Sequence, residues 1–306
     1  MMLKIKKWFH RLCQSVWTIG FIETDIDDIV RGKPYKVKWL DIPSDRWFAD
    51  PFILDVNDDY IILLAEEWNY EYEKGEISKI VVERKSNAII DVIPILQLDS
   101  HLSFPAIYKK DGVVYVAPEN SESGNLNIYK YNESDDSLSD VKCICPHPLT
   151  DAIITDALGE KLLFTTLRGN PNGNTLEVFV WKSEAGQFEK YSSVSFNENV
   201  ARMAGHFFVH DGVVIRPGQV CNSAYGQAVS LQKVTKNGDS FEMEEIRRLY
   251  STHKRLKNGM HTFNYSQGVI VVDAWGWKAP LLRKLFVDDW GNMRNWIKVI
   301  AQIGQK

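Results

Sequence analysis

Five segments of the chain repeat one pattern of polar and apolar positions. Each has a short lead of small or polar residues, an apolar strand, a tight turn and a second apolar strand. Successive segments start roughly 50 residues apart, a spacing typical of repeat folds. They start at Ala49, Ser103, Thr150, Met203 and Met260. Asp-Gly pairs at 111–112 and 211–212 supply the positive φ angle of a tight hairpin turn. The pattern predicts five hairpins in one register.

Weaker alternating strands lie between these hairpins, as in NLNIYKYN and VKCIC after the second one. A hairpin with two outer strands is one blade of a β-propeller. After the last hairpin only a helical pattern remains, so its outer strands are expected from the N-terminal segments 17–24 and 35–42. The sequence therefore predicts an all-β fold, a five-bladed β-propeller over residues 17–280 that N-terminal strands close.

Short helices are expected at both ends, over residues 1–16 and 281–306. Apolar residues of the first segment recur at helical spacing, while lysine, histidine and arginine take the other face. The apolar residues are Ile5, Trp8, Phe9, Leu12 and Val16. One interpretation packs both helices on the propeller. The other rests the basic first helix on an anionic inner membrane as a peripheral contact.

Composition narrows the class of protein. The chain has 306 residues, 44% hydrophobic and 25% charged, as a folded globular protein does. A net charge of -4 argues against a nucleic-acid partner. Four cysteines form no disulfide framework, and the start does not resemble a signal peptide, so a cytoplasmic location is expected. The Cys-Ile-Cys-Pro-His run at 143–147 lacks a second ligand pair, and we expect neither a metal nor a cofactor. Ten tryptophans suit either a sugar-handling protein or a large β core.

The shared register places polar side chains at one rim of the central channel, where inner strands begin and their partners end. The equivalent positions that open the inner strands are Asp50, Phe104, Asp151, Ala204 and His261. Those that close the returning strands are Glu66, Glu119, Thr166 and Gln219. Carboxylates in one cleft raise each other's pKa, which suits acid–base or nucleophilic chemistry. The structural alternative is that Asp opens a turn or strand and Glu at a strand end is simply solvated.

Cations and further polar groups are expected at the same rim. Arg202 and Arg216 lie near the hairpin of the fourth blade, as ion-pair partners of the carboxylates or as planar donors to carboxylate or phosphate. His101 and His261 precede inner strands and suit sugar hydroxyls or proton transfer. The predicted catalytic residues are Asp50, Glu119 and Asp151. The predicted substrate-binding residues are Glu66, His101, Ser103, Arg202, Arg216, Gln219 and His261.

The Asp-Pro opening, the five hairpins and the rim acids resemble the five-bladed furanosidase propellers of the arabinanase and β-xylosidase class. That resemblance implies that Asp50 is the base and that Asp151 tunes the pKa of a partner. It also implies a glutamic acid in the fourth blade as the proton donor. This chain reads Met203-Ala204-Gly205 there, with Arg202 beside it, so the expected acid is missing.

A closer resemblance extends over nearly the whole chain. It is similar to the propeller domain at the N-terminus of plant glucosamine inositolphosphorylceramide transferases and in bacterial proteins of surface-polysaccharide gene clusters. The matching motifs are Trp17-Thr-Ile-Gly20, Phe48-Ala-Asp-Pro-Phe52, His101-Leu-Ser-Phe-Pro105, Ala117-Pro-Glu119, Ala201-Arg-Met-Ala-Gly205, Ile215-Arg-Pro-Gly-Gln219, Tyr225-Gly226 and His261-Thr-Phe-Asn264. The resemblance implies that a separate C-terminal glycosyltransferase domain is the catalyst in the plant proteins.

Three functions fit this chain. The first is a glycosyltransferase-like enzyme of bacterial surface polysaccharide synthesis, of capsule or O-antigen, with a nucleotide or lipid phosphate sugar donor and a glycan acceptor. Phosphate leaves without a proton if cations hold it, so Arg202 and Arg216 can replace the missing acid while Asp50 is base or nucleophile. The second is a furanosidase-like hydrolase that uses Glu119 or Glu66 as acid. The third is a non-catalytic glycan-binding propeller. The sequence favours the first.

Overall fold

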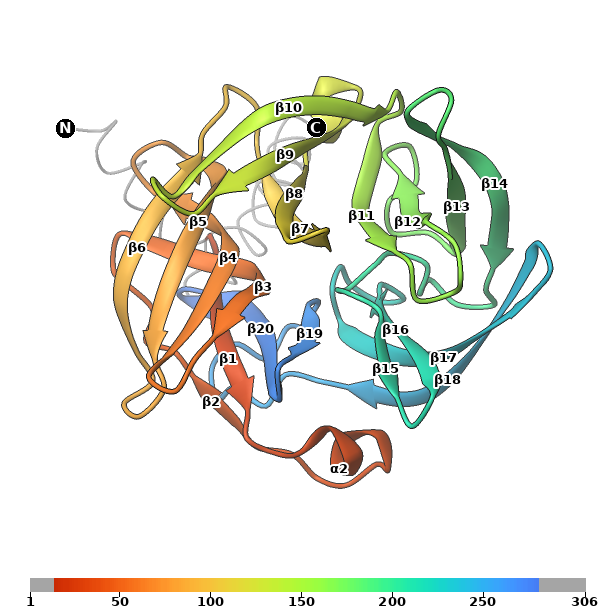
Figure 1. The fold of residues 1–306 in the computed structure, drawn as a ribbon. Coiled ribbons are helices and arrows are strands. Elements are labelled where there is room, and N and C mark those ends of the chain that lie inside the picture. Colours follow the sequence, from red (N-terminus) through yellow and green to blue (C-terminus); the bar gives the residue numbers. More distant parts are fainter. Residues whose placement is uncertain (1–13, 281–306) are drawn as a thin grey trace, which may run out of the picture.

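The computed structural model describes residues 14–280 of the chain. Their strands form five four-stranded sheets in a ring around a central axis (Figure 1). Neighbouring strands within the sheets pair antiparallel, so each sheet is one propeller blade. The predicted all-β, five-bladed propeller is therefore confirmed. The predicted helix over 281–306 and residues 1–13 of the N-terminal helix lie outside the described residues.

The blades follow one another along the chain. Blade one contains β3 (Arg46–Val56), β4 (Tyr60–Asn69), β5 (Lys74–Glu83) and β6 (Ala88–Leu96). Blade two contains β7 (Ser103–Lys110), β8 (Val113–Glu119), β9 (Leu126–Asn132) and β10 (Ser137–Cys145). Blade three contains β11 (Leu149–Thr155), β12 (Leu162–Leu167), β13 (Thr175–Lys182) and β14 (Gln187–Ser195). Blade four contains β15 (Phe208–His210), β16 (Val213–Val220), β17 (Ala228–Asn237) and β18 (Ser240–Leu249).

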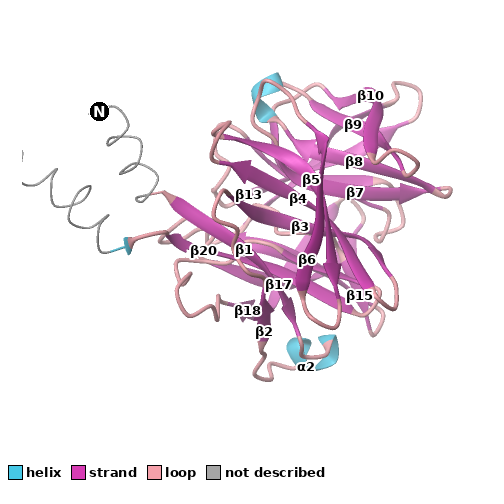
Figure 2. Cartoon of the chain, turned by 90° about the vertical axis from the view of Figure 1, so that its left-hand side faces the viewer, coloured by secondary structure: helices cyan, strands magenta, loops and turns pink. Residues whose placement is uncertain are grey.

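The fifth blade closes the ring by joining both ends of the described chain. It contains β19 (Phe263–Ser266), β20 (Val269–Trp277), β1 (Ser15–Ile22) and β2 (Val37–Trp39). β1 pairs with β20 from Ser15 opposite Trp277 to Ile22 opposite Ile270, and the two strands reach the same side of the molecule (Figure 2). The N-terminal origin of these outer strands is as predicted. Ser15 and Val16 belong to β1, however, so the expected helix over 1–16 does not include them.

Two short helical segments complete the described chain. They are α2 (Ile26–Val30), between β1 and β2, and the 3-10 turn η1 (Ser121–Ser123), after β8. Neither resembles a membrane span, and none of the helices within residues 14–280 has the length and apolar character to cross a bilayer.

The same β-bulge opens the inner strand of three blades. Asp50, Phe104 and Asp151 have positive φ angles of 50°, 43° and 49°, and the strand register shifts at each of them. A left-handed backbone is unfavourable for a residue with a side chain, although Asp tolerates it better than most residues. A bulge re-aims the side chain at its position. The shared bulge thus explains how the rim residues depart from the plain alternation of the strands.

Aromatic and aliphatic side chains fill the propeller next to these bulges. Phe52, Phe104, Ile153 and Phe164 are fully buried members of one core cluster that joins the first four blades. The rings of Phe52 and Phe104 meet edge to face with centroids 4.9 Å apart. Burying a side chain of this size contributes about 1.5–3 kcal/mol to folding. This packing gives the polar rim a rigid support.

Candidate active site

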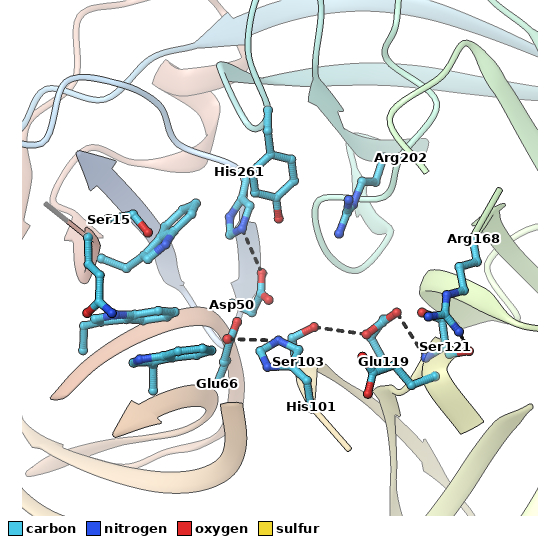
Figure 3. A pocket seen from close by; sticks show the side chains of 16 residues that line it. Ser15, Asp50, Glu66, His101, Ser103, Glu119, Ser121, Arg168, Arg202 and His261 are labelled. Carbon is cyan, nitrogen blue, oxygen red and sulfur yellow. Dashed lines mark hydrogen bonds and ion pairs between the residues drawn. The ribbon is translucent and has the colours of Figure 1, made fainter. Parts of the chain in front are cut away.

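A cavity of about 460 Å³ opens at the rim where the inner strands begin. All five blades contribute to its lining (Figure 3). Seven of the residues predicted for the site line it, namely Asp50, Glu66, His101, Ser103, Glu119, Arg202 and His261. Asp151 and Gln219 are bonded to this set through Arg202 and to each other. Arg216 lies instead in the core of blade four.

Asp50 is held by donors from the two neighbouring blades. Its Oδ2 accepts the backbone N–H of Phe104 at 3.1 Å, and its Oδ1 accepts the hydroxyl of Thr262 at 2.9 Å. The residue is only 4% exposed. Burial raises the pKa of Asp50 to about 6 against the opposing charge of His261, and the carboxylate of Asp151 adds to the rise. Asp50 is therefore mostly ionised at neutral pH and is a stronger base than an ordinary aspartate.

The imidazole of His261 lies between two carboxylates. Its Nδ1 lies 2.6 Å from Oδ2 of Asp273, and its Nε2 lies 3.6 Å from Oδ1 of Asp50. Burial disfavours a charged ring, but the carboxylates of Asp273 and Asp50 outweigh it and raise the pKa of His261. For Asp273, burial alone would raise the pKa of the carboxyl group, but the charge of His261 and the backbone donors keep that pKa below its usual value. A charged imidazolium beside an ionised Asp273 follows from these contacts.

Asp50, His261 and Asp273 also have the residue types of a metal site, since one ligand atom of each lies within 4.8 Å of the others. The oxygens of Asp273 already have donors. Oδ1 accepts the backbone N–H groups of His261 and Thr262, and Oδ2 accepts the N–H of Asp50 besides the ring nitrogen of His261. A cation would have to displace these bonds, so the arrangement fits a protein ion pair better than a metal centre.

Glu66 is the best candidate for a protonated acid in the cavity. His101 Nδ1 accepts the N–H of Gly75 at 2.9 Å, so the neutral ring carries its proton on Nε2, which lies 3.4 Å from Oε1 of Glu66. Burial lowers the pKa of His101. Burial, with the charge of Asp50 next in importance, raises the pKa of Glu66 well above its usual value. The environment of Glu66 therefore favours its protonated form.

Glu119 is a second carboxyl group with a raised pKa. Burial is the main cause, and the charge of Asp151 adds to it. Its Oε1 accepts the N–H of Ser121 at 3.2 Å, and its Oε2 accepts the hydroxyl of Ser103 at 3.4 Å (Figure 3). These bonds fix the side chain on the wall formed by the second blade.

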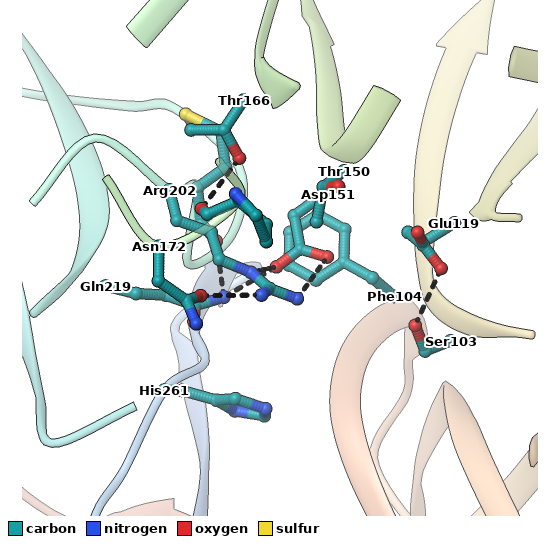
Figure 4. A network of polar contacts seen from close by, with 12 residues as sticks. Ser103, Phe104, Glu119, Thr150, Asp151, Thr166, Asn172, Arg202, Gln219 and His261 are labelled. Atoms are coloured by element: carbon teal, nitrogen blue, oxygen red, sulfur yellow. Dashed lines mark hydrogen bonds and ion pairs between the residues drawn. The ribbon is translucent and has the colours of Figure 1, made fainter. Parts of the chain in front are cut away.

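Arg202 is fixed by a carboxylate that does not itself line the cavity. Its guanidinium donates to both oxygens of Asp151, at 2.6 and 3.3 Å, and to Oδ1 of Asn172 at 2.8 Å (Figure 4). Gln219 donates to Oδ2 of Asp151 as well, at 2.6 Å. Burial disfavours the charge of Arg202, but Asp151 holds its pKa above the usual value. The network presents a permanently charged planar donor to the cavity.

The expected role of Arg216 at the rim conflicts with its position. The residue is fully buried, and its guanidinium donates to the carbonyl oxygens of Val200 and Ala201 and to Oε1 of Gln232. Burial lowers its pKa to about 9. Met203 pairs with Gly218 as Ala49 pairs with Glu66, so Arg216 stands where blade one has the core residue Leu64. Arg216 supports the backbone that carries Arg202 and does not reach the cavity.

Replacing Arg216 with alanine is expected to lower the free energy of unfolding by about 3 kcal/mol or more. The change removes the guanidinium that donates to the buried carbonyl oxygens of Val200 and Ala201, and it opens a cavity. Chemical denaturation measures the loss. Arg84→Ala, at an exposed arginine, should change stability by less than about 0.5 kcal/mol. Equal stability of the two variants would contradict the structural role of Arg216.

Aromatic rings form one wall of the cavity. Trp17 stacks on His261 with centroids 4.2 Å apart, and Trp47 stacks on Trp68 at 5.6 Å with an interplanar angle of 2°. Tyr225 lines the cavity on the side of Arg202, whose guanidinium lies 4.9 Å from the ring centroid. Flat apolar rings beside carboxyl groups and donors suit a sugar, which has apolar faces and hydroxyl edges.

Sequence reasoning missed several residues of this site. Asp273 is an acid within the apolar run Val269–Trp277, and an acid inside such a run is a signal that could have identified it. Arg168 lines the cavity from the loop after β12, and Trp47 and Trp68 come from blade one. Their positions depend on loops and on rotamers that strand alternation does not describe.

Solved structures share this fold at low sequence identity. An exo-β-1,3-galactanase from Phanerochaete chrysosporium is 10% identical with a TM-score of 0.55, over 82% of this chain and 66% of the other. A thermostable family-43 glycoside hydrolase is 12% identical with a TM-score of 0.53, over 80% of this chain and 90% of the other. These similarities support the propeller fold alone.

Sequence comparison identifies the family. A protein named glucosamine inositolphosphorylceramide transferase 1 from Arabidopsis thaliana is 28% identical over 201 residues, and one from Oryza sativa subsp. japonica is 26% identical over 199. These regions cover 63% and 62% of this chain but only 26% of each relative. The model of the family "Glucosamine inositolphosphorylceramide transferase 1, N-terminal" matches residues 36–268. The chain belongs to this N-terminal domain family.

Proposed function

We propose that this propeller acts in glycosyl transfer and that the rim cavity is where a sugar and its phosphate leaving group bind. The observation that carries the proposal is a charged guanidinium, Arg202, held by Asp151 on the same cavity as the buried carboxylate of Asp50. The transferase names of the relatives point to the same class of reaction. The aromatic wall would bind the sugar face.

The proposed reaction needs one base and one site for the departing charge. The hydroxyl oxygen of the acceptor forms a bond to the anomeric carbon, and its proton passes to Asp50. The bond between that carbon and the phosphate oxygen breaks, and the phosphate takes the electron pair. Arg202, with Arg168 at the cavity rim, would hold this charge without donating a proton.

Burial of the glutamates makes the cavity more compatible with a phosphate. It raises the pKa of both Glu66 and Glu119 and so favours their neutral forms. The carboxylates of Asp151 and Asp273 are paired with Arg202 and His261. The carboxylates of the cavity lining that remain for a dianionic leaving group to meet are then those of Asp50 and of the exposed Glu122.

Hydrolysis is a second candidate, and the raised pKa of Glu66 favours it. A glycosidase needs a protonated acid near the leaving oxygen and a carboxylate base or nucleophile. Glu66 and Asp50 supply this pair of groups from one blade, with Glu119 as another donor. The non-catalytic alternative is a propeller that only binds glycans.

Incubating the purified protein with nucleotide sugars, lipid-linked sugar phosphates and aryl glycosides separates these functions. Transfer from a phosphate donor supports the proposal, and release of free sugar from aryl glycosides alone supports hydrolysis. Arg168→Ala should lower turnover of the phosphate donors and leave hydrolysis of aryl glycosides unchanged. Arg84→Ala is its matched control. Both arginines are exposed and donate to a backbone carbonyl, at 3.0 and 2.8 Å, but only Arg168 lines the cavity. Glycan binding without any turnover would defeat the proposal.

The cellular setting that we propose is synthesis of a bacterial surface polysaccharide, a capsule or an O-antigen, at the inner membrane. Its support is the motif resemblance and the basic segment 1–16. The protein should sediment with vesicles that contain anionic lipid, and added salt should release it. A variant with Lys4, Lys6, Lys7 and Arg11 changed to glutamine should lose this binding. Equal sedimentation of both proteins would remove the membrane proposal.

A further inference from the structure

We propose that Asp273 is a positioning residue of this site. Its carboxylate binds the ring of His261 as a cation beside Asp50, and this cation keeps Asp50 in its ionised, proton-accepting form. The inference rests on the proposed function for its catalytic consequence. Its structural content is independent of that function, because it concerns the protonation and orientation of one imidazole ring.

Asp273 organises the backbone on both sides of the ring. It lies on β20 and is fully buried. Its carboxylate accepts backbone N–H groups from His261, Thr262 and Asp50, at 2.9, 3.1 and 3.2 Å. One side chain therefore ties the left-handed residue Asp50 of blade one to the opening of the inner strand of blade five. An acceptor that receives this many donors remains ionised.

The ring of His261 has little freedom to turn. Trp17 stacks on it at 4.2 Å, and Tyr225 meets it edge-on at 5.3 Å. At Gly226 a Cβ atom would lie 2.8 Å from Cβ of His261, which shows how closely that loop packs. With Nδ1 bonded to Asp273, Nε2 must face Asp50. The cation is thus placed beside the carboxylate oxygen that also accepts the Thr262 hydroxyl.

Several other charged or titratable groups act on Asp50 and His261. They are Glu66 on β4, Asp151 on β11, Arg202 before β15 and Tyr225 after β16. Most of these groups are acidic, and the guanidinium of Arg202 is already paired with Asp151. His261 is therefore the cation closest to Asp50, at 3.6 Å, among the ion pairs of the described residues.

The test is the variant Asp273→Asn. Asp156→Asn is its control, because Asp156 is an exposed aspartate that lines a second cavity and not the candidate site. In the native protein at pH 7, nitrogen-15 NMR should report both ring nitrogens of His261 as protonated, with a strongly deshielded Nδ1 proton. His261→Gln assigns the signals. In Asp273→Asn the ring should become neutral, because the amide replaces the charge. Asp156→Asn should leave the signals unchanged.

Catalysis supplies the second arm of the test. The cation of His261 lowers the pKa of Asp50 by more than the carboxylate of Asp273 raises it, so losing both charges raises the pKa of Asp50. Activity that needs ionised Asp50 is then lost at a higher pH. The acid limb of the pH–rate profile should move up by about one unit. A native His261 that is neutral at pH 7, or a ring state that Asp273→Asn does not change, overturns the inference. If no donor is turned over, the proposed function fails, and the NMR result still decides the role of Asp273.

Discussion

Replacing Asp50 with asparagine is expected to abolish turnover of every sugar donor, with a loss on the order of 10³ or more. Transfer needs this carboxylate to accept the proton of the acceptor, and hydrolysis needs it as base or nucleophile. Asparagine has nearly the same shape and tolerates the left-handed backbone of this position, where φ is 50°. Initial rates with a phosphate donor and with an aryl glycoside measure the effect.

Asp140→Asn is a close control for this experiment. Asp140 also has a φ of 50° at a β-bulge, but it is exposed on the outer strand β10 and far from the cavity lining. It should retain native rates. Binding of the sugar to Asp50→Asn should persist, because the aromatic wall is unchanged. Rates within tenfold of native for Asp50→Asn, on a substrate that the native protein converts, would exclude Asp50 as the base.

The fold was predictable because one hairpin recurs five times. Each repeat places glycine or aspartate at a turn and apolar residues on the inner strands, so errors in a single blade do not change the outcome. The missing outer strands of the last blade pointed to the N-terminus, and β1 and β2 occupy that place.

The site residues could be predicted from the sequence only where they occupy equivalent positions of the repeat. Asp50 and Asp151 occupy equivalent bulges in blades one and three. Their equivalent positions in the sequence repeat predicted that both lie at the same rim. Blade four departs from the pattern, because Gly218 rather than Gln219 occupies the position equivalent to Glu66. A shift of one residue reverses the face of a strand. This uncertainty is why Arg216 was expected at the rim although it lies in the core.

Loss of the Arg202 guanidinium is expected to reduce transfer from a phosphate donor by a factor on the order of 10². The charge is held in place before the reaction by two bonds to Asp151, so it can meet a departing phosphate without rearrangement. Arg202→Gln removes the charge and keeps a polar side chain. Hydrolysis of an aryl glycoside should change little, since a phenolate leaves without help from a phosphate site.

Two companions keep this prediction distinct from a loss of folding. Arg202→Gln leaves the buried Asp151 without its ion pair, which costs stability. Combining it with Asp151→Asn removes both charges, and the double variant should regain stability but not transfer. Arg248→Gln is the matched control, because Arg248, on the outer strand of the same blade, also donates to both oxygens of a carboxylate, that of Glu245, and to Glu198. If Arg202→Gln and Arg248→Gln transfer sugar equally well, the leaving phosphate is not bound at Arg202. If transfer and aryl hydrolysis fall together in the double variant, the guanidinium acts on the sugar rather than on the phosphate.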